Sequence, residues 1–270
     1  MAASIETARL RPVARADLVR LGPPRDGGYV VPGDVVRESD HLLALGIGDD
    51  WQFETAFARV NPRARILGVD ASIGATRFAR ECLGSALHLL SFGRSGKERR
   101  RHWTRLRRAA HYFWFFGWRH RHVRRMVGAD TTPATVTLPA LLASVGTVRP
   151  HGIFLKVDVE GAEYTLIDAI AAQAQTIGCL VIEFHRTSRH ARAFNAAMAR
   201  LLGPFRVVHV HGNNYAPRDP VSGFPDAVEI TLIHEQLCPR PLVPIDVEYP
   251  RAGLDHPNHP GRPDYAITFA

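Results

Sequence analysis

One stretch of the sequence, residues 153–163, limits the fold more than any other. Its apolar run Ile-Phe-Leu-Lys-Val is followed closely by two carboxylates, Asp158 and Glu160, and then by Gly161 and Glu163. This pattern predicts a buried parallel strand that delivers acids at its carboxyl end, which is where open α/β sheets bind ligands. Glu163 falls where the first turn of the next helix is expected, a position at which the helix dipole favours a negative charge.

Apolar runs of strand length alternate with helical segments along most of the chain, and this alternation predicts a parallel α/β sheet. The last two strands are separated by a loop alone, which predicts an antiparallel hairpin at one edge. The expected fold is a Rossmann-like, seven-stranded, mostly parallel sheet with one antiparallel edge strand and a basic helical insert, the layout of S-adenosylmethionine-dependent methyltransferases. The expected strands are 41–48, 65–69, 86–92, 153–159, 179–184, 205–211 and 227–234, and the expected helices include 13–21, 51–60, 78–82, 139–145, 162–172 and 190–202.

Three regions are expected along the chain. Residues 1–40 form a lead-in, in which a turn leads into a short strand near Tyr29. Residues 41–235 form the main α/β domain, with the insert at 94–130. The proline-rich residues 236–270 form an extension packed on the domain, ending in a short strand at 265–269.

Composition indicates a cytoplasmic protein. No window approaches the roughly 18 uninterrupted apolar residues of a membrane span. The first 21 residues carry four arginines but no apolar core of a secretory signal. Cys82, Cys179 and Cys238 are odd in number and far apart, which does not fit a disulfide framework or a CxxC metal site.

A Gly46-x-Gly48 turn follows the first expected strand of the main domain and opens a helix, the context of a nucleotide-binding loop. A dinucleotide is disfavoured because the third glycine of GxGxxG would fall at Trp51. The acids Asp49 and Asp50 would also face the pyrophosphate. A cofactor with a positive centre, S-adenosylmethionine, fits better, although Asp49 in a purely structural role would only cap the helix.

Two further features support a cofactor site. Asp70 ends the next strand, 22 residues after Gly48, where an acid takes ribose hydroxyls in nucleotide-binding α/β folds. The segment Asp26-Gly27-Gly28-Tyr29 is either an ordinary tight turn or a loop that lies across the cofactor, with glycines that allow close backbone approach.

Acids and histidines follow the ends of three later strands: Asp158 after the fourth, Glu183 and His185 at the fifth, and His209 and His211 at the sixth. Each alone would be read as a capping or surface residue. Together they predict a rim that could remove the proton of an acceptor hydroxyl, with Asp158, His185 and His211 as the catalytic candidates.

The same rim could instead hold a divalent metal. Asp158, Glu183 and His185 are the candidate ligands, because carboxylates and imidazoles suit Mg²⁺, Mn²⁺ or Zn²⁺. No local ligand motif such as HExxH is present. A divalent metal therefore stays an open alternative to a protein base.

The basic charge is confined to one segment. Residues 97–125 hold eleven lysines and arginines against Glu98 alone, a net +10 that leaves −2 for the rest of the chain. Seven aromatic residues are interleaved with them between 103 and 118. The segment is either a helical insertion packed on the domain or on another subunit, or a contact with an anionic membrane or acceptor. Nucleic acid is disfavoured because no binding-fold signature accompanies the segment.

Several of these motifs together resemble the FkbM-type S-adenosylmethionine-dependent methyltransferases. The most specific is Lys156-Val-Asp158-Val-Glu160-Gly161-Ala-Glu163. The others are similar to a branch that opens with an Asp-Gly-Gly-Tyr loop: they are 26–30, 46–50 with 53–54, 182–185, 211–215 and, in the tail, 254–258. The resemblance runs from about residue 20 to the C-terminus, without the insert.

The resemblance implies a Rossmann-like methyltransferase whose cofactor lies at Gly46, Gly48 and Asp70. Gly28, Tyr29 and Asp158 complete the expected cofactor site. It also implies O-methylation of a hydroxyl on a saccharide, glycolipid or natural product, small or lipid-linked. The alternatives are a non-catalytic module that docks to an anionic membrane or nucleic acid through residues 97–127 and, less favoured, an NAD-dependent oxidoreductase.

Overall fold

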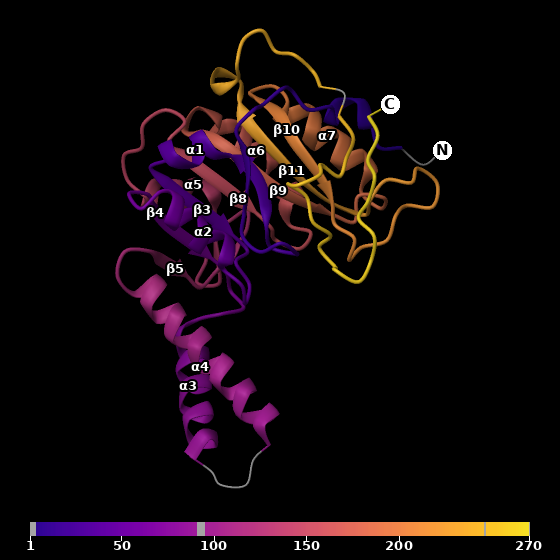
Figure 1. Cartoon of the computed structure of the whole chain (residues 1–270). Coiled ribbons are helices and arrows are strands. Elements are labelled where there is room, and N and C mark those ends of the chain that lie inside the picture. Colours follow the sequence, from indigo (N-terminus) through magenta and orange to yellow (C-terminus); the bar gives the residue numbers. More distant parts are fainter. Residues whose placement is uncertain (1–3, 91–94, 246, 270) are drawn as a thin grey trace.

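The fold is built on a mixed sheet with helices packed against both of its faces (Figure 1). The computed structural model describes residues 4–90, 95–245 and 247–269. Within these residues a seven-stranded sheet has the order β10-β11-β9-β8-β3-β4-β5. Its strands are β3 (His41–Leu45), β4 (Arg65–Val69), β5 (Arg121–Val123), β8 (Ile153–Val157), β9 (Ile177–His185), β10 (Phe205–Gly212) and β11 (Ala227–His234).

Strand directions confirm the predicted layout. β3 pairs in parallel with β4 and β8, β8 with β9, and β4 with β5. β11 runs antiparallel to both β9 and β10. The β10–β11 hairpin forms one edge of the sheet, and its antiparallel strand β11 lies second from that edge, between β9 and β10.

The central strands are buried on both faces. Successive side chains of a strand point to opposite faces, and in β3 this places Leu43 and Leu45 in one core and Leu42 and Ala44 in the other. The first core packs under α5 (Leu138–Ser144), α6 (Ile167–Ala172) and α7 (Ala191–Leu201). The second packs under α1 (Gly33–Glu38) and α2 (Gln52–Val60).

The helix predicted at 13–21 is wrong. Leu18–Leu21 is a strand, β1, which pairs antiparallel with β2 (Tyr29–Pro32). The glycine and prolines after Leu21 turn the chain back, so that β2 satisfies the backbone groups of β1. Leu18 and Leu21 are buried in this ribbon and contribute to the second core.

The strand predicted at 86–92 is also wrong. Residues 86–90 belong to a helix, α3 (Ala75–Leu90), while 91 and 92 lie outside the described residues. The apolar run Ala-Leu-His-Leu-Leu resembles a strand, but its helix packs against α4 (Gly96–Gly117) through contacts such as Phe78 with Tyr112. The strand that pairs with β4 is β5, inside the basic segment.

Helices α3 and α4 form an antiparallel hairpin that projects from the body of the molecule (Figure 1). α4 begins with a capping box, in which Ser95 accepts from the backbone N–H of Glu98 and the Glu98 carboxylate accepts from that of Ser95. A short parallel ladder of β6 (Met126–Val127) and β7 (Thr135–Val136) follows β5.

The tail after β11 is mostly irregular. The strand predicted at 265–269 is reduced to one bridge, between Tyr249 and Ile267. Ile267 and Phe269 are nevertheless buried in the first core, and Asn258 is fully buried. No helix in the described part of the chain is long and apolar enough to cross a membrane.

Candidate active site

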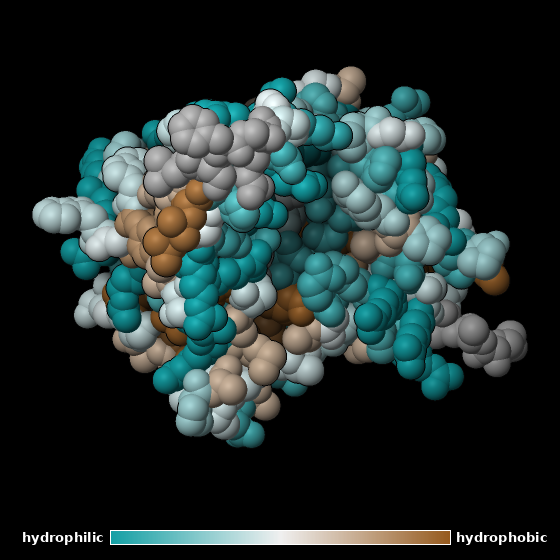
Figure 2. Space-filling view, turned by 90° about the horizontal axis from the view of Figure 1, so that it is seen from below, coloured by the Kyte–Doolittle hydropathy of each residue, from teal (hydrophilic) through white to brown (hydrophobic). Residues whose placement is uncertain are grey.

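A cavity of about 750 Å³ lies at the carboxyl ends of β3, β4 and β8. The hairpin begins at its margin, since α3 starts at Ala75, just after Ser72 of the cavity lining. Figure 2, which looks at the face from which the hairpin projects, shows a central hollow lined mainly by hydrophilic residues. The residues that line the cavity are 25–27, 46–50, 69–72, 125–127, 156, 158–160 and 162.

The glycine loop forms one wall of the cavity. Gly46 has φ +75°, and a Cβ atom there would lie 1.6 Å from the backbone oxygen of Asp158, so a side chain cannot be accommodated. Gly48 also has a positive φ, of 51°, and its N–H donates to Asp70 Oδ2 over 2.9 Å. The strand ends of β3 and β4 are thereby held together around an open space.

Asp70 is anionic in this position. Burial alone would raise the pKa of its carboxyl group, but hydrogen bonds from Ser72 and from the Gly48 N–H outweigh burial and lower the pKa. Ser72 donates both its backbone N–H and its hydroxyl to Asp70 Oδ1, each over 2.6 Å. The strand-end acid is therefore fixed as a hydrogen-bond acceptor on the cavity wall.

The acids Asp49 and Asp50 are paired with arginines. Arg77 lies 2.8 Å and Arg108 3.5 Å from Asp49 Oδ2, and Arg25 lies 3.1 Å from Asp50 Oδ2. Both arginines at Asp49 come from the hairpin. Asp49, which sequence reasoning assigned to a positive cofactor or a helix cap, does not cap α2; it lines the cavity and also joins the hairpin to the glycine loop.

The Asp-Gly-Gly-Tyr loop contributes unevenly to the cavity. Asp26 and Gly27 line it, whereas the predicted Gly28 and Tyr29 are outside the lining. The Tyr29 hydroxyl donates to Asp158 Oδ2 over 3.1 Å. Tyr29 thus orients the Asp158 carboxylate without itself lining the cavity.

Lys156 and Glu54 form a buried ion pair beneath the loop. Lys156 Nζ lies 3.6 Å from Glu54 Oε1, 3.9 Å from Asp158 Oδ2, and donates to the Gly46 carbonyl over 3.3 Å. Both side chains are buried. Sequence reasoning missed this pair. The signal was a lysine inside an apolar strand, since an unpaired lysine is almost never fully buried.

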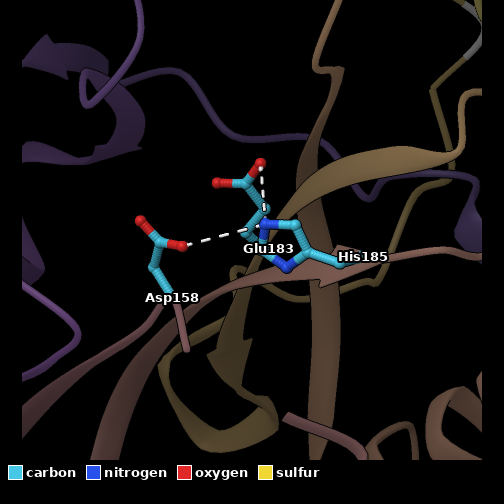
Figure 3. Close-up of side chains that lie close together, drawn as sticks. All are labelled: Asp158, Glu183 and His185. Atoms are coloured by element: carbon cyan, nitrogen blue, oxygen red, sulfur yellow. Dashed lines mark ion pairs between the residues drawn. The ribbon is translucent and has the colours of Figure 1, made fainter. Parts of the chain in front are cut away.

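Asp158, Glu183 and His185 converge at the ends of β8 and β9 (Figure 3). His185 Nε2 lies 3.6 Å from Glu183 Oε1 and 4.0 Å from Asp158 Oδ1. The exposed carboxylate of Glu160 lies 3.6 Å from the same nitrogen. Asp158 and Glu160 also line the cavity, so the cluster adjoins it.

Glu163 holds His185 from the other side. Its Oε1 accepts the backbone N–H of His185 over 2.7 Å and lies 3.5 Å from the ring nitrogen Nδ1. Its Oε2 accepts the N–H of Gly161 over 2.7 Å. Because Glu160 and Gly161 have φ of +53° and +108°, the turn after β8 is tight and brings Glu163 back to β9.

The cluster is a strong proton acceptor. Burial would lower the pKa of His185, but Glu163, Asp158 and Glu160 outweigh burial and raise it. Burial raises the pKa of Glu183 well above its usual range, and the neighbouring charges of Asp158 and Glu229 raise it further.

Two histidines of β10 do not join this cluster. His211 Nε2 lies 3.0 Å from the carboxylate of Asp264, and Nδ1 lies 3.2 Å from Glu229 Oε2. Burial would lower the pKa of His211, but these carboxylates outweigh burial and raise it to about 10. His211, predicted as catalytic, lies in the structure as a buried cation between two acids. His209 likewise pairs with an acid of the tail, Asp255, at 3.1 Å.

Two asparagines join the tail and β10 to the site. Asn213 donates to Glu183 Oε1 over 2.8 Å and to Asp26 Oδ1 over 3.3 Å. Asn258 donates to the same Asp26 oxygen over 3.1 Å and to Glu229 Oε1 over 2.6 Å. These amides hold acids that would otherwise repel one another, and they explain two of the motifs near the C-terminus.

The Asp158, Glu183 and His185 ligand atoms lie within 4.8 Å of one another, close enough to surround one divalent cation. The contact of Nδ1 with Glu163 resembles the outer carboxylate that usually orients a metal-bound histidine. The same geometry suits an imidazolium between carboxylates. The donor set therefore fits both uses.

The strand order, with its reversed strand beside β10, and the cavity at a glycine loop define the class of S-adenosylmethionine-dependent methyltransferases. A family model, the methyltransferase FkbM domain, matches residues 48–206. The chain belongs to this family of methyltransferases, and its cofactor is S-adenosylmethionine. The cavity suits that cofactor: Gly48 faces open space, and Asp70 offers a fixed acceptor.

Similar solved structures include other methyltransferases. Precorrin-6y C5,15-methyltransferase from Geobacter metallireducens is 11% identical, with 75% of this chain and 86% of that chain covered and a TM-score of 0.36. The O-methyltransferase TomG from Streptomyces achromogenes, solved with the cofactor, is 11% identical over 76% and 82% of the two chains, with a TM-score of 0.36. A protein described as an rRNA methylase, from Clostridium thermocellum, is 10% identical, with 75% of this chain and 92% of that chain covered and a TM-score of 0.40. A search of curated proteins gave no match.

Proposed function

We propose that the protein transfers a methyl group to a hydroxyl oxygen. Gly46, Gly48 and Asp70 hold the cofactor in the cavity, and the acceptor hydroxyl lies at Asp158 and His185. The observation that carries this proposal is the position of His185 Nε2, which lies among three carboxylates beside the cavity.

Oxygen acceptors need a base, and His185 fits that role. When bound, S-adenosylmethionine supplies an electrophilic methyl group on a sulfonium. His185 Nε2 would take the proton of the acceptor hydroxyl, while Glu163 fixes the ring through Nδ1 and the backbone. The neighbouring carboxylates stabilise the resulting imidazolium. A positioned base of this kind contributes about 10²–10⁴-fold to the rate.

The acceptor is a polyhydroxylated molecule, a saccharide, glycolipid or hydroxylated natural product. Support comes from the acids Asp26, Asp158 and Glu160, which line the cavity as hydrogen-bond acceptors. Glu160 is 85% exposed at the side chain and can accept from hydroxyls beside the reacting one.

Titration calorimetry with S-adenosylmethionine and its demethylated product tests the cofactor site. We expect Asp70→Ala to weaken binding of both and His185→Ala to leave it unchanged. Failure of the unaltered protein to bind either compound, alone or with saccharide present, would contradict the proposed cofactor site.

The oxygen acceptor has its own test. S-adenosylmethionine labelled with carbon-13 in the methyl group, incubated with the protein and a panel of saccharides, glycolipids and polar cell extracts, should give labelled methyl ethers by NMR. Labelled carbon, nitrogen or sulfur methyl groups without ethers would overturn the proposal. Repeating the reaction in EDTA, with and without added Mg²⁺ or Mn²⁺, decides whether Asp158, Glu183 and His185 work as a protein base or through a metal.

A further inference from the structure

Helix α4 carries a stripe of indoles and guanidinium groups that is interrupted by one alanine. Its members recur every three or four residues, the spacing that places side chains on one face of a helix. The three tryptophans of the stripe are 58%, 72% and 96% exposed, in chain order. The stripe consists of Arg99, Trp103, Arg107, Ala110, Trp114 and, at the end of the helix, Trp118.

The basic side chains of α4 have few acidic partners. Arg108 pairs with Glu81 and Asp49 at the base of the hairpin. No other lysine or arginine of α4 forms an ion pair within residues 4–90, 95–245 and 247–269, and the acid of the helix, Glu98, serves the capping box. The projecting part of the hairpin therefore carries uncompensated positive charge.

A second cavity lies at the end of the stripe. It measures about 600 Å³ and is lined by Trp118 and by four arginines, Arg63, Arg65, Arg119 and Arg121. No aspartate or glutamate contributes to this lining. His41 and Arg65, the first residues of β3 and β4, place it at the opposite end of the sheet from the cofactor cavity. Guanidinium groups around a pocket of this size suit a phosphate group.

We infer that the α4 stripe and this arginine-lined cavity dock the protein on the surface of an anionic lipid bilayer. Indoles reside at the boundary between headgroups and acyl chains, and arginines beside them pair with lipid phosphates. The cavity at the end of the stripe takes one anionic headgroup.

Apolar exposure favours a bilayer over a nucleic acid. On α3, the other helix of the hairpin, Leu83 and Leu87 are 65% and 60% exposed. Aliphatic side chains gain from burial among acyl chains, whereas contacts to a nucleic acid are made by cations and stacking rings. The hairpin also projects from the body (Figure 1), so it can meet a flat surface.

The test uses the full chain and vesicles of two compositions, phosphatidylcholine alone and phosphatidylcholine with about 30% phosphatidylglycerol. Three of the four tryptophans are exposed on the stripe, while Trp51 is 3% exposed, so intrinsic fluorescence reports directly on the stripe. We expect co-sedimentation and a blue-shifted emission only with the anionic vesicles, and quenching by brominated acyl chains.

Two variants separate the parts of the surface, and a third serves as the control. Trp103→Ala/Trp114→Ala and Arg65→Glu/Arg121→Glu should each weaken vesicle binding at least about tenfold. The matched control Arg189→Glu/Arg192→Glu makes the same change of charge on exposed residues elsewhere and should bind like the unaltered protein.

No binding to anionic vesicles would overturn the inference, as would equal loss in the control. Binding to single-stranded RNA but not to vesicles would replace the bilayer by a nucleic acid. Binding of soluble glycerol phosphate, without binding to vesicles, would mean that the cavity binds a free phosphate compound and not a lipid headgroup in a bilayer.

Discussion

The two charged regions of this protein differ in whether their charges are paired. At the carboxyl ends of the strands, buried charges have assigned partners: Lys156 lies beside Glu54, and His211 lies between Glu229 and Asp264. On α4, the arginines other than Arg108 are exposed and have no acidic partner in the described structure. Burial makes an unpaired charge costly, whereas water tolerates it. The first region is therefore fixed by the fold, while the second is left for a partner outside the chain.

The largest effect should follow from breaking the pair beneath the glycine loop. Lys156→Met leaves the carboxylate of Glu54 buried without its cation, which should cost about 3–5 kcal/mol of unfolding free energy. Chemical denaturation measures this loss. The double variant Lys156→Met/Glu54→Gln should recover much of it, and a single variant as stable as the unaltered protein would mean that the pair is not needed.

Removing the proposed base should affect turnover and spare the fold. His185→Ala should lower kcat by about 10²–10⁴-fold with the affinity for S-adenosylmethionine unchanged. In the unaltered enzyme, kcat/KM should rise with pH through a pKa above 6.5, because the charged form of His185 cannot accept a proton and its pKa is raised. A flat profile over this range would exclude His185 as the base.

A third prediction concerns His211 and pH. Its folded-state pKa of about 10 lies above its ordinary value of 6.5, so its contribution to stability is complete below pH 6.5 and is lost as pH rises through 10. Thermal unfolding from pH 6.5 to 10 should show this decline, and the decline should be smaller in His211→Asn. An equal slope in both proteins would assign the decline to other groups.

The smallest effect on stability is expected on the hairpin. Arg99→Glu/Arg107→Glu changes exposed side chains that form no ion pair with any described residue, so Tm should stay within about 2 °C of the unaltered protein. A much larger fall would show that these arginines serve the fold, which would remove the contrast between the two regions.

Sequence reasoning predicted the strands that are apolar on both faces. β8 and β9 were recognisable because they are continuous apolar runs, and the acids after them could be placed at one rim because parallel strands end together. Asp158, Glu183 and His185 were therefore predicted as neighbours and do converge.

Features that depend on contacts with other elements of the fold could not be predicted in this way. The segment 86–90 has the composition of a strand, and its helix is decided by contacts with the following helix, α4, such as that of His88 with His102. The ion pairs of His211 could not be predicted for a similar reason. One of its acids, Asp264, comes from an irregular tail, and no local pattern places that carboxylate beside β10.

One aspartate, Asp49, belongs to both regions, since it lines the cofactor cavity and pairs with Arg77 and Arg108 of the hairpin. This shared charge is a contact through which movement of the hairpin would reach the glycine loop. Any ligand that shifts the hairpin and so changes cofactor affinity must have its own affinity changed by the cofactor by the same factor. Occupancy at the glycine loop and occupancy on α4 would then report on each other, without a separate regulatory domain.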